Sequence, residues 1–288
     1  YVVVDEGGQC HPAYVVSALM RAKQAMIIGD VHQLEPIFTL SVDEETRILE
    51  ALDGDSDSIT ERAFRVFENC GHSAQRSAEL VCNPPKKLTE HFRSVPEIVT
   101  ICDKMCSYGL NVRTEKATTS LAEGILTAPH LIVPTYGVQR RNRGSWCNQK
   151  ELQTIMQWLQ ALSHHGVNWN DVAVLTPYAG QLDALRQTFF DWRSSNGPGL
   201  SSSQSGRPTF GTVHRFQGGE KEIVLFSTVV SEARSLHFQN RRCNLVNVAI
   251  SRAKSHFVTV GNPEALRQGE YTRWLVEGAV VGHIDEIV

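Results

Sequence analysis

Gly211 to Val230 reads Gly-Thr-Val-His-Arg-Phe-Gln-Gly-Gly-Glu-Lys-Glu-Ile-Val-Leu-Phe-Ser-Thr-Val-Val, and Asn247 to Lys254 reads Asn-Val-Ala-Ile-Ser-Arg-Ala-Lys. In the first segment a charged, glycine-rich turn precedes an apolar run, Ile223–Val230, that is long enough for a strand buried on both faces. In the second segment small residues surround Arg252 in a helix-like pattern. An arginine fixed on a helix beside a parallel sheet suits phosphate, because its guanidinium is always charged and can bind bidentately. The alternative is a surface arginine on an ordinary helix.

The composition is that of an ordinary soluble protein. The 288 residues suffice for two α/β domains or one large one, and the net charge of -3 does not indicate a nucleic-acid partner, so any such site must be a local basic patch. The seven cysteines include no Cys-x-x-Cys pair, which favours reduced thiols over disulfides or zinc. No apolar run approaches a membrane span and no signal peptide is visible. We therefore expect an intracellular protein, cytoplasmic or nuclear, not secreted and without a membrane partner.

Strand-like and helix-like segments alternate along the chain, which predicts an α/β fold with a doubly wound parallel sheet in each half. Ala25–Gly29 and Asp171–Tyr178 are expected to be buried strands. Gln149–Leu162 is expected to be an amphipathic helix. Ser94 is expected to cap a helix that runs from Pro96 to about residue 108.

A break at Asn83-Pro-Pro85 predicts two domains, residues 1–85 and residues 86–288. Further helices are expected at about 59–70 and 264–278. The basic segment 139–143 is expected to be a solvated loop, with nucleic-acid contact as the alternative.

Two of the predicted strands end in polar loops. The first strand runs into Asp5 and Glu6, and the second is followed by a loop that contains Gln33. The carboxyl ends of parallel strands are where α/β sheets bind ligands. A carboxylate pair there suits Mg²⁺ coordination and orientation of a water molecule, as in nucleoside triphosphate hydrolysis. Acidic residues also end strands in ordinary loops, and a single glutamine is often only a loop cap.

Taken together, these segments resemble the carboxyl-terminal part of superfamily 1 helicases, which are AAA-type, RecA-like P-loop NTPases, in the group that contains senataxin and the nonsense-mediated-decay helicase. The resemblance covers nearly the whole chain, in the family's order. The segments that carry it are Val2–Gln9 (Walker B), Gly29–Pro36, Leu88–Pro96, Ser145–Glu151, Val172–Tyr178, Thr212–Glu222 and Asn247–Lys254.

The resemblance implies the end of a first motor domain followed by a complete second one, with ATP and Mg²⁺ bound. Asp5 would hold Mg²⁺, Glu6 would polarise the attacking water and Gln33 would contact the terminal phosphate. Arg93 and Arg252 would stabilise the charge on the transferred phosphoryl group. The residues that the resemblance implies in nucleotide binding are Phe92, Gly219 and Glu220.

The resemblance also implies a surface for a nucleic-acid strand, DNA or RNA, single-stranded or duplex. Its residues would be Thr176, Pro177, Tyr178, Thr212 and His214. The sequence departs from the family's pattern at three places: Gly7 stands in place of alanine, His91-Phe92 in place of Gln-Tyr and His214-Arg215 in place of Asp-Ser. The last change adds positive charge beside the expected strand path.

The phosphate-cradling Gly-x-x-x-x-Gly-Lys-Thr/Ser motif is not in this sequence. In the family that motif precedes the Walker B strand, with which this chain begins, so we expect a missing upstream part of the first motor domain. We therefore expect this chain to be part of an ATP-dependent helicase or translocase motor. By itself the chain is expected to be inactive. The alternatives are a non-catalytic or degenerate nucleic-acid-binding module and, much less favoured, a metal-dependent nuclease.

Overall fold

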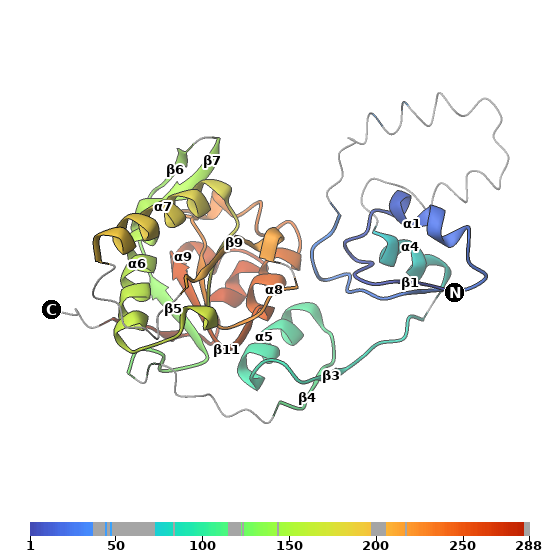
Figure 1. Ribbon diagram of the computed structural model, residues 1–288, viewed down its shortest axis with the longest axis horizontal. Coiled ribbons are helices and arrows are strands. Elements are labelled where there is room, and N and C mark those ends of the chain that lie inside the picture. The colour runs from blue at the N-terminus through green and yellow to red at the C-terminus, as the bar shows by residue number, and fades with distance from the viewer. Residues whose placement is uncertain are drawn as a thin grey trace. The chain divides into compact units, whose positions relative to one another are not determined.

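The computed structural model describes residues 1–36, 44, 47, 73–82, 84–114, 122, 124–142, 144–196, 206–216 and 218–284. The chain divides into two compact units, Tyr1–Leu88 and Thr89–Val288, each of which is treated by itself (Figure 1). The division falls three residues after the end of the first expected domain, residue 85. The helix expected at 59–70 lies outside the described residues.

The first unit contains two short parallel strands and two helices among its described residues: β1 (Val2–Val4), α1 (Pro12–Leu19), β2 (Ala25–Ile27) and α4 (Ala74–Val81). Pro12 opens α1, where its fixed φ angle suits the first helical turn. The expectation that Ala25–Gly29 is a buried strand is wrong. Val3 and Met26 are 62% and 56% exposed, because a two-stranded sheet leaves part of both strands uncovered by the described residues.

The second unit is built on a six-stranded parallel sheet with the strand order β12-β5-β11-β10-β8-β9. These strands are β5 (His130–Pro134), β8 (Val172–Thr176), β9 (Thr209–Thr212), β10 (Lys221–Ser227), β11 (Ala253–Gly261) and β12 (Val280–Val281). The helices are α5 (Pro96–Cys106), α6 (Gln149–His164), α7 (Ala179–Asn196), α8 (Asn244–Ser251) and the short α9 (Pro263–Leu266). Two short strands, β3 (Glu90–His91) and β4 (Asn111–Val112), pair with each other outside this sheet.

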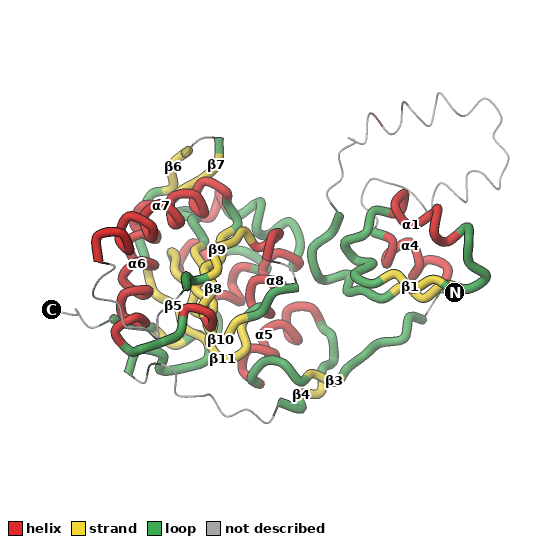
Figure 2. The backbone as a smooth tube through the Cα atoms, viewed as in Figure 1, coloured by secondary structure: helices red, strands yellow, loops and turns green. Residues whose placement is uncertain are grey.

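Helices cover both faces of this sheet (Figure 2). Because side chains alternate along a strand, Ile223 and Leu225 of β10 point to one face, where they join the core formed with α6 and α7. Phe226 points to the other face and contacts Phe257 with 5.9 Å between ring centroids. A parallel sheet with helices on both sides confirms the expected doubly wound α/β fold of a RecA-like domain.

The amphipathic helix and the buried strand that follows it are confirmed as α6 and β8. Three other expectations are wrong. The described residues of the basic segment, 139–142, form a strand and not a loop: β6 (Gln139–Asn142) pairs with β7 (Ser145–Asn148) in a β-hairpin. Cross-strand partners Arg141 and Trp146 form a cation–π contact there, 5.1 Å from guanidinium to ring centroid, which stabilises the strand pair.

The closing helix expected at 264–278 is broken. It consists of α9 and a separate 3₁₀ turn, η6 (Thr272–Leu275). Asn240 accounts for the break, because its side-chain oxygen accepts hydrogen bonds from the backbone N–H groups of Tyr271 and Thr272 at 2.7 and 3.1 Å. Ser94 does not cap α5 either. Val95 takes the N-cap position, and the Ser94 hydroxyl donates instead to the carbonyl of Ala253 at 2.7 Å.

A fully buried carboxyl group fastens the loop after β10 to the start of α6. Oε2 of Glu151 accepts from the Val229 backbone N–H and the Ser227 hydroxyl, both at 2.7 Å, and Oε1 accepts from Thr228 at 3.3 Å. Val229 has a φ of 69°, which is strained for a β-branched residue. We infer that the bonds to Glu151 compensate for this strain.

Burial raises the pKa of Glu151 from 4.5 to about 8, against the opposing effect of these hydrogen bonds. The folded state therefore keeps a proton that the unfolded chain releases, and this contribution to stability falls as pH rises from 4.5 to about 8. The slope is at most about 1.4 kcal/mol per pH unit. We expect Glu151→Gln to reduce the slope of unfolding free energy against pH. Urea unfolding at a series of pH values between 4.5 and about 8 measures this slope.

The matched control is Glu277→Gln, because Glu277 is an exposed carboxyl group in the same unit. It should leave the pH dependence unchanged. An equal slope in the unsubstituted protein and in Glu151→Gln would contradict the raised pKa.

Candidate functional site

The expected site residues of the second unit lie at opposite ends of its strands. Thr212 pairs with Thr176 at the carboxyl ends of β9 and β8. Glu220 precedes Lys221, which pairs with Ala253 at the amino ends of β10 and β11. Residues 213–220, which include the 3₁₀ turn η4 (Val213–Phe216), connect the two ends. Within the second unit, the candidate nucleotide residue Glu220 and the candidate nucleic-acid residues are thus separated by the length of the strands.

In the first unit, Asp5, Glu6 and Gln33 lie in two adjacent loops after β1 and β2. The Gly7 N–H donates to the carbonyl of Ile28 at 2.7 Å, which ties one loop to the other. Asp30 holds Gln33 by accepting from its side-chain amide at 3.3 Å. Glu6 has a φ of 53°, an uncommon conformation for a residue other than glycine, and its carboxylate accepts from Gln9 at 2.6 Å.

Glycine is required where these two loops touch. A Cβ atom on Gly29 would lie 2.6 Å from the backbone nitrogen of Gly8 and 2.9 Å from that of Gly7. A Cβ atom on Gly7 would lie 2.5 Å from a side-chain methyl group of Ile27. The glycine that stands at position 7 in place of the family's alanine therefore fits the close packing of the loops.

The residues of these loops fit the chemistry of a magnesium site. Asp5 is exposed and offers carboxylate oxygen, the ligand type that Mg²⁺ prefers. One of its oxygens, Oδ1, accepts from the backbone N–H of Glu6 at 2.9 Å, which orients the group. Exposed Glu6 is the next residue, so two carboxylates follow one strand.

In the second unit, a carboxylate lies between two cations. Glu220 Oε2 lies 2.6 Å from Arg93 Nε, and Oε1 lies 2.7 Å from Lys254 Nζ. We call Arg93, Gly219, Glu220, Arg252 and Lys254 the Glu220 cluster. Lys254, followed by Arg93 and Arg252, lowers the pKa of the Glu220 carboxyl group, so it is ionised at neutral pH. Three cations around one anion leave an excess of positive charge, which suits a phosphate group.

Backbone hydrogen bonds bring Arg93 to this cluster. The Val95 N–H donates to the carbonyl of Lys254 at 2.9 Å, next to the bond from Ser94 to Ala253. His91 accepts from the Ser94 N–H at 3.0 Å and must be neutral to do so. Burial, and then the charge of Arg93, lower the pKa of His91, which favours that neutral form. Phe92, between them, is 69% exposed.

Arg252 lies at the C-cap of α8, not within the helix, and is only 2% exposed. Its guanidinium donates to the carbonyl of Val248 at 3.1 Å, to the carbonyl of Gly219 at 3.3 Å and to the hydroxyl of Ser251 at 3.0 Å. The carbonyl contact with Gly219 places Arg252 beside Glu220. The expected nucleotide residues Arg93, Gly219, Glu220 and Arg252 are therefore neighbours in space.

The expected nucleic-acid residues differ in exposure. Thr176 and Pro177 are buried, and the Thr176 hydroxyl accepts from the backbone N–H of Tyr178. Tyr178 and Thr212 are partly exposed and His214 is exposed. Only the last three side chains can contribute to a surface in this arrangement.

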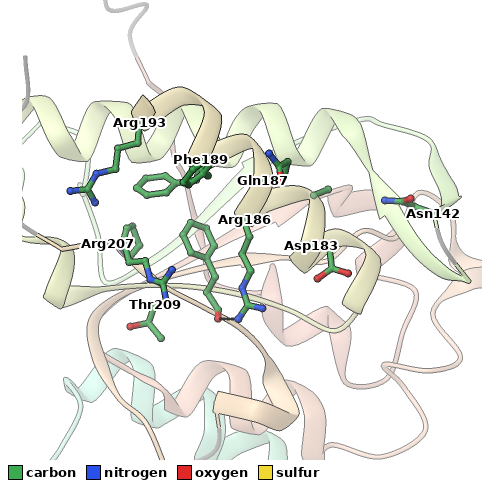
Figure 3. Close-up of a pocket in the computed structure, with 12 residues that line it drawn as sticks. Asn142, Asp183, Arg186, Gln187, Phe189, Arg193, Arg207 and Thr209 are labelled. Carbon is green, nitrogen blue, oxygen red and sulfur yellow. Dashed lines mark hydrogen bonds between the residues drawn. The ribbon is translucent and has the colours of Figure 1, made fainter. Parts of the chain in front are cut away.

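A separate groove of about 1100 Å³ lies along α7 and β9 (Figure 3). Arg186, Arg193 and Arg207 line it, together with the 66% exposed Phe190. Arg186 donates to the carbonyl of Phe210 at 2.8 Å. None of the expected site residues lines this groove.

Lys254 ends the Asn247–Lys254 motif but is not among the expected site residues. The structure pairs it with Glu220, and it is the largest cause of the lowered Glu220 pKa. The only feature of the sequence that could have indicated this contact is a second cation two residues after Arg252. In a strand, residues two apart share a face, but Arg252 lies just outside β11, so spacing alone did not identify the contact.

We expect Lys254→Met to raise the pKa of Glu220 toward its ordinary range, because the strongest partner of the carboxylate is removed. The pKa of Glu220 is measured by NMR, from the chemical shift of its carboxyl carbon as a function of pH. Lys150→Met, which removes an exposed lysine, is the control and should leave the Glu220 titration unchanged. An unchanged Glu220 pKa in Lys254→Met would show that Lys254 does not hold the carboxylate.

Among the described residues, no helix has both the length and the apolar character needed to cross a membrane.

The chain resembles several proteins over nearly its whole length. It is 28% identical over 309 residues to "Probable RNA helicase armi" of Drosophila melanogaster, covering 96% of this chain and 24% of that protein. It is 27% identical over 292 residues to "DNA-binding protein SMUBP-2" of Mesocricetus auratus, covering 96% and 26%.

The yeast "ATP-dependent helicase NAM7" of Saccharomyces cerevisiae is 26% identical over 283 residues, covering 95% of this chain and 26% of that protein. This chain thus spans about a quarter of the length of these relatives. A family model described as an AAA domain matches residues 67–264, more than half of the chain. With these matches the expected resemblance to superfamily 1 helicases is confirmed, and the chain belongs to this AAA domain family.

Proposed function

We propose that this chain is part of an ATP-dependent helicase or translocase that couples ATP hydrolysis to movement along a nucleic-acid strand and to unwinding of duplex. The Glu220 cluster carries the proposal. An ionised carboxylate fixed between Arg93 and Lys254, with Arg252 beside it, offers both a hydroxyl acceptor and phosphate donors within a few ångströms. The helicase names of two relatives support the same activity.

ATP is the substrate in this proposal, and each unit supplies its own residues. In the second unit, Glu220 accepts from a ribose hydroxyl, with Gly219 and Phe92 beside the nucleotide. Arg93 and Arg252 donate to the oxygens of the transferred phosphoryl group, where arginine fingers typically accelerate hydrolysis by about 10³–10⁵. For this, the guanidinium of Arg252 exchanges its backbone carbonyl acceptors for phosphate oxygens.

In the first unit, Asp5 holds Mg²⁺, which when bound neutralises phosphate charge. Glu6 polarises the attacking water, and Gln33 contacts the terminal phosphate. An upstream part of the first motor domain supplies the phosphate-cradling loop, so this chain alone is inactive. An intracellular location, in the cytoplasm or the nucleus, belongs to the proposal, and the absence of a disulfide among the described cysteines agrees with it.

Nucleic acid binds at the carboxyl ends of β8 and β9 in this proposal. Thr176, Pro177, Tyr178, Thr212 and His214 contribute, the first two through their backbone because their side chains are buried. The names of the relatives include both an RNA helicase and a DNA-binding protein, so the proposal covers both nucleic acids.

We expect Arg252→Lys, in the complete protein, to reduce nucleic-acid-stimulated phosphate release by about 10³-fold and to change nucleotide affinity little. Lysine keeps the charge but cannot bind two phosphate oxygens with one planar group. Arg267→Lys, at an exposed arginine of the same unit, is the control. Arg93→Lys is a second test, since Arg93 is 46% exposed and its replacement should not affect folding.

Full turnover in both lysine variants would contradict the finger roles. No hydrolysis by the unsubstituted complete protein, together with retained nucleic-acid binding, would favour a non-catalytic binding module. Equilibrium binding of a fluorescent ATP analogue separates lost affinity from lost chemistry.

A further inference from the structure

Three aromatic side chains form a row at the carboxyl edge of the large sheet. The ring of Phe238 lies 5.6 Å from that of Tyr178 and 6.3 Å from that of His214, measured between centroids. The interplanar angles are 40° and 32°. Tyr178 follows β8, His214 follows β9 and Phe238 belongs to the loop after β10, so three separate segments meet here.

Phe238 is held on the surface by buried neighbours. It is 47% exposed, whereas Leu236 and Gln239 beside it are 4% and 0% exposed. The side-chain amide of Gln239 donates to the carbonyl of Thr228 at 2.7 Å, which fixes this loop to the end of β10. An exposed aromatic ring on a fixed loop costs solvation free energy in the isolated protein, which a ligand that covers the ring would recover.

The base of the β6–β7 hairpin braces the same loop. The side-chain amide of Gln139 donates to the hydroxyl of Ser235 at 2.8 Å, and its oxygen accepts from the Ser231 N–H at 3.3 Å. The ring of Phe238 is therefore held in place before any ligand binds, which reduces the entropy cost of binding.

We propose that Phe238 is a stacking platform for a base of single-stranded nucleic acid, next to Tyr178 and His214. This inference rests on the proposed function and adds to it a residue that sequence reasoning did not identify. Aromatic rings bind bases of any sequence through their faces, while nearby cations contact the phosphates. Exposed Arg215 follows His214 and adds positive charge beside the row, whereas Arg234, four residues before Phe238, is paired with Glu232 at 2.6 Å.

The test is equilibrium binding of the complete protein to oligothymidylate and oligouridylate of about 16 nucleotides, a length that fills one such binding path. Phe238→Ala and Phe238→Leu should each bind about tenfold more weakly, the loss expected for one base–aromatic stack. Phe238→Tyr keeps the ring and should bind like the unsubstituted protein. The same oligonucleotides without bases should not distinguish these variants, because their phosphates remain.

Phe190→Ala is the matched control, an exposed phenylalanine on the arginine-lined groove of α7. Unchanged binding by Phe238→Ala would overturn the inference, as would equal losses on oligonucleotides with and without bases. A loss in Phe190→Ala but not in Phe238→Ala would assign the strand to that groove instead. If the unsubstituted protein binds neither oligonucleotide, the proposed function itself fails. If it binds but Phe238→Ala binds equally well, only the inference about Phe238 fails.

Discussion

Two hydrogen bonds at the start of β11 determine the arrangement of the Glu220 cluster. The carbonyls of Ala253 and Lys254 accept from Ser94 and Val95, which lie more than 150 positions earlier in the chain. They bring Arg93 from the start of the second unit to the turn before β10. Without these two hydrogen bonds, the cations near Glu220 would come only from the segment that contains Arg252 and Lys254. The same strand provides Lys254, so β11 both positions the cluster and contributes to it.

The carboxyl edge of the sheet is organised by a different means. There the buried network around Glu151 fixes the loop after β10, and that loop continues toward Phe238. The strained backbone of Val229 and the hydrogen bond from Gln239 lie on the same path. The buried carboxyl group of Glu151 therefore helps to fix the start of the loop that carries this exposed aromatic ring.

Sequence reasoning was most successful where hydrophobic patterns are long. Helix α6 and strand β8 follow directly from their apolar spacing, because burial of one helix face or a whole strand needs many residues of one kind. The broken helix after residue 263 was missed because a side chain distant in sequence, Asn240, binds the backbone at the break, next to Gly269. Ser94 was misassigned for the same reason, since a nearby carbonyl competed with the helix end for its hydroxyl.

The candidate site was predictable in part. Motif resemblance identified Arg93, Glu220 and Arg252, which the structure places together, although their chemical roles remain predictions. It could not identify Lys254 or Phe238, because their contacts depend on the meeting of separate strands and loops. The β6–β7 hairpin was also hidden, since polar and charged residues with one tryptophan carry little of the apolar alternation typical of strands.

Residues 213–220 run from the carboxyl end of β9 to the amino end of β10, with β8 between those two strands. The segment is folded and not extended, because η4 is followed by a second turn in which the Gly219 N–H donates to the carbonyl of Phe216 at 3.1 Å. His214 and Glu220 lie at opposite ends of this one short segment. A single covalent connection of a few residues thus joins the candidate nucleic-acid edge of the sheet to the Glu220 cluster.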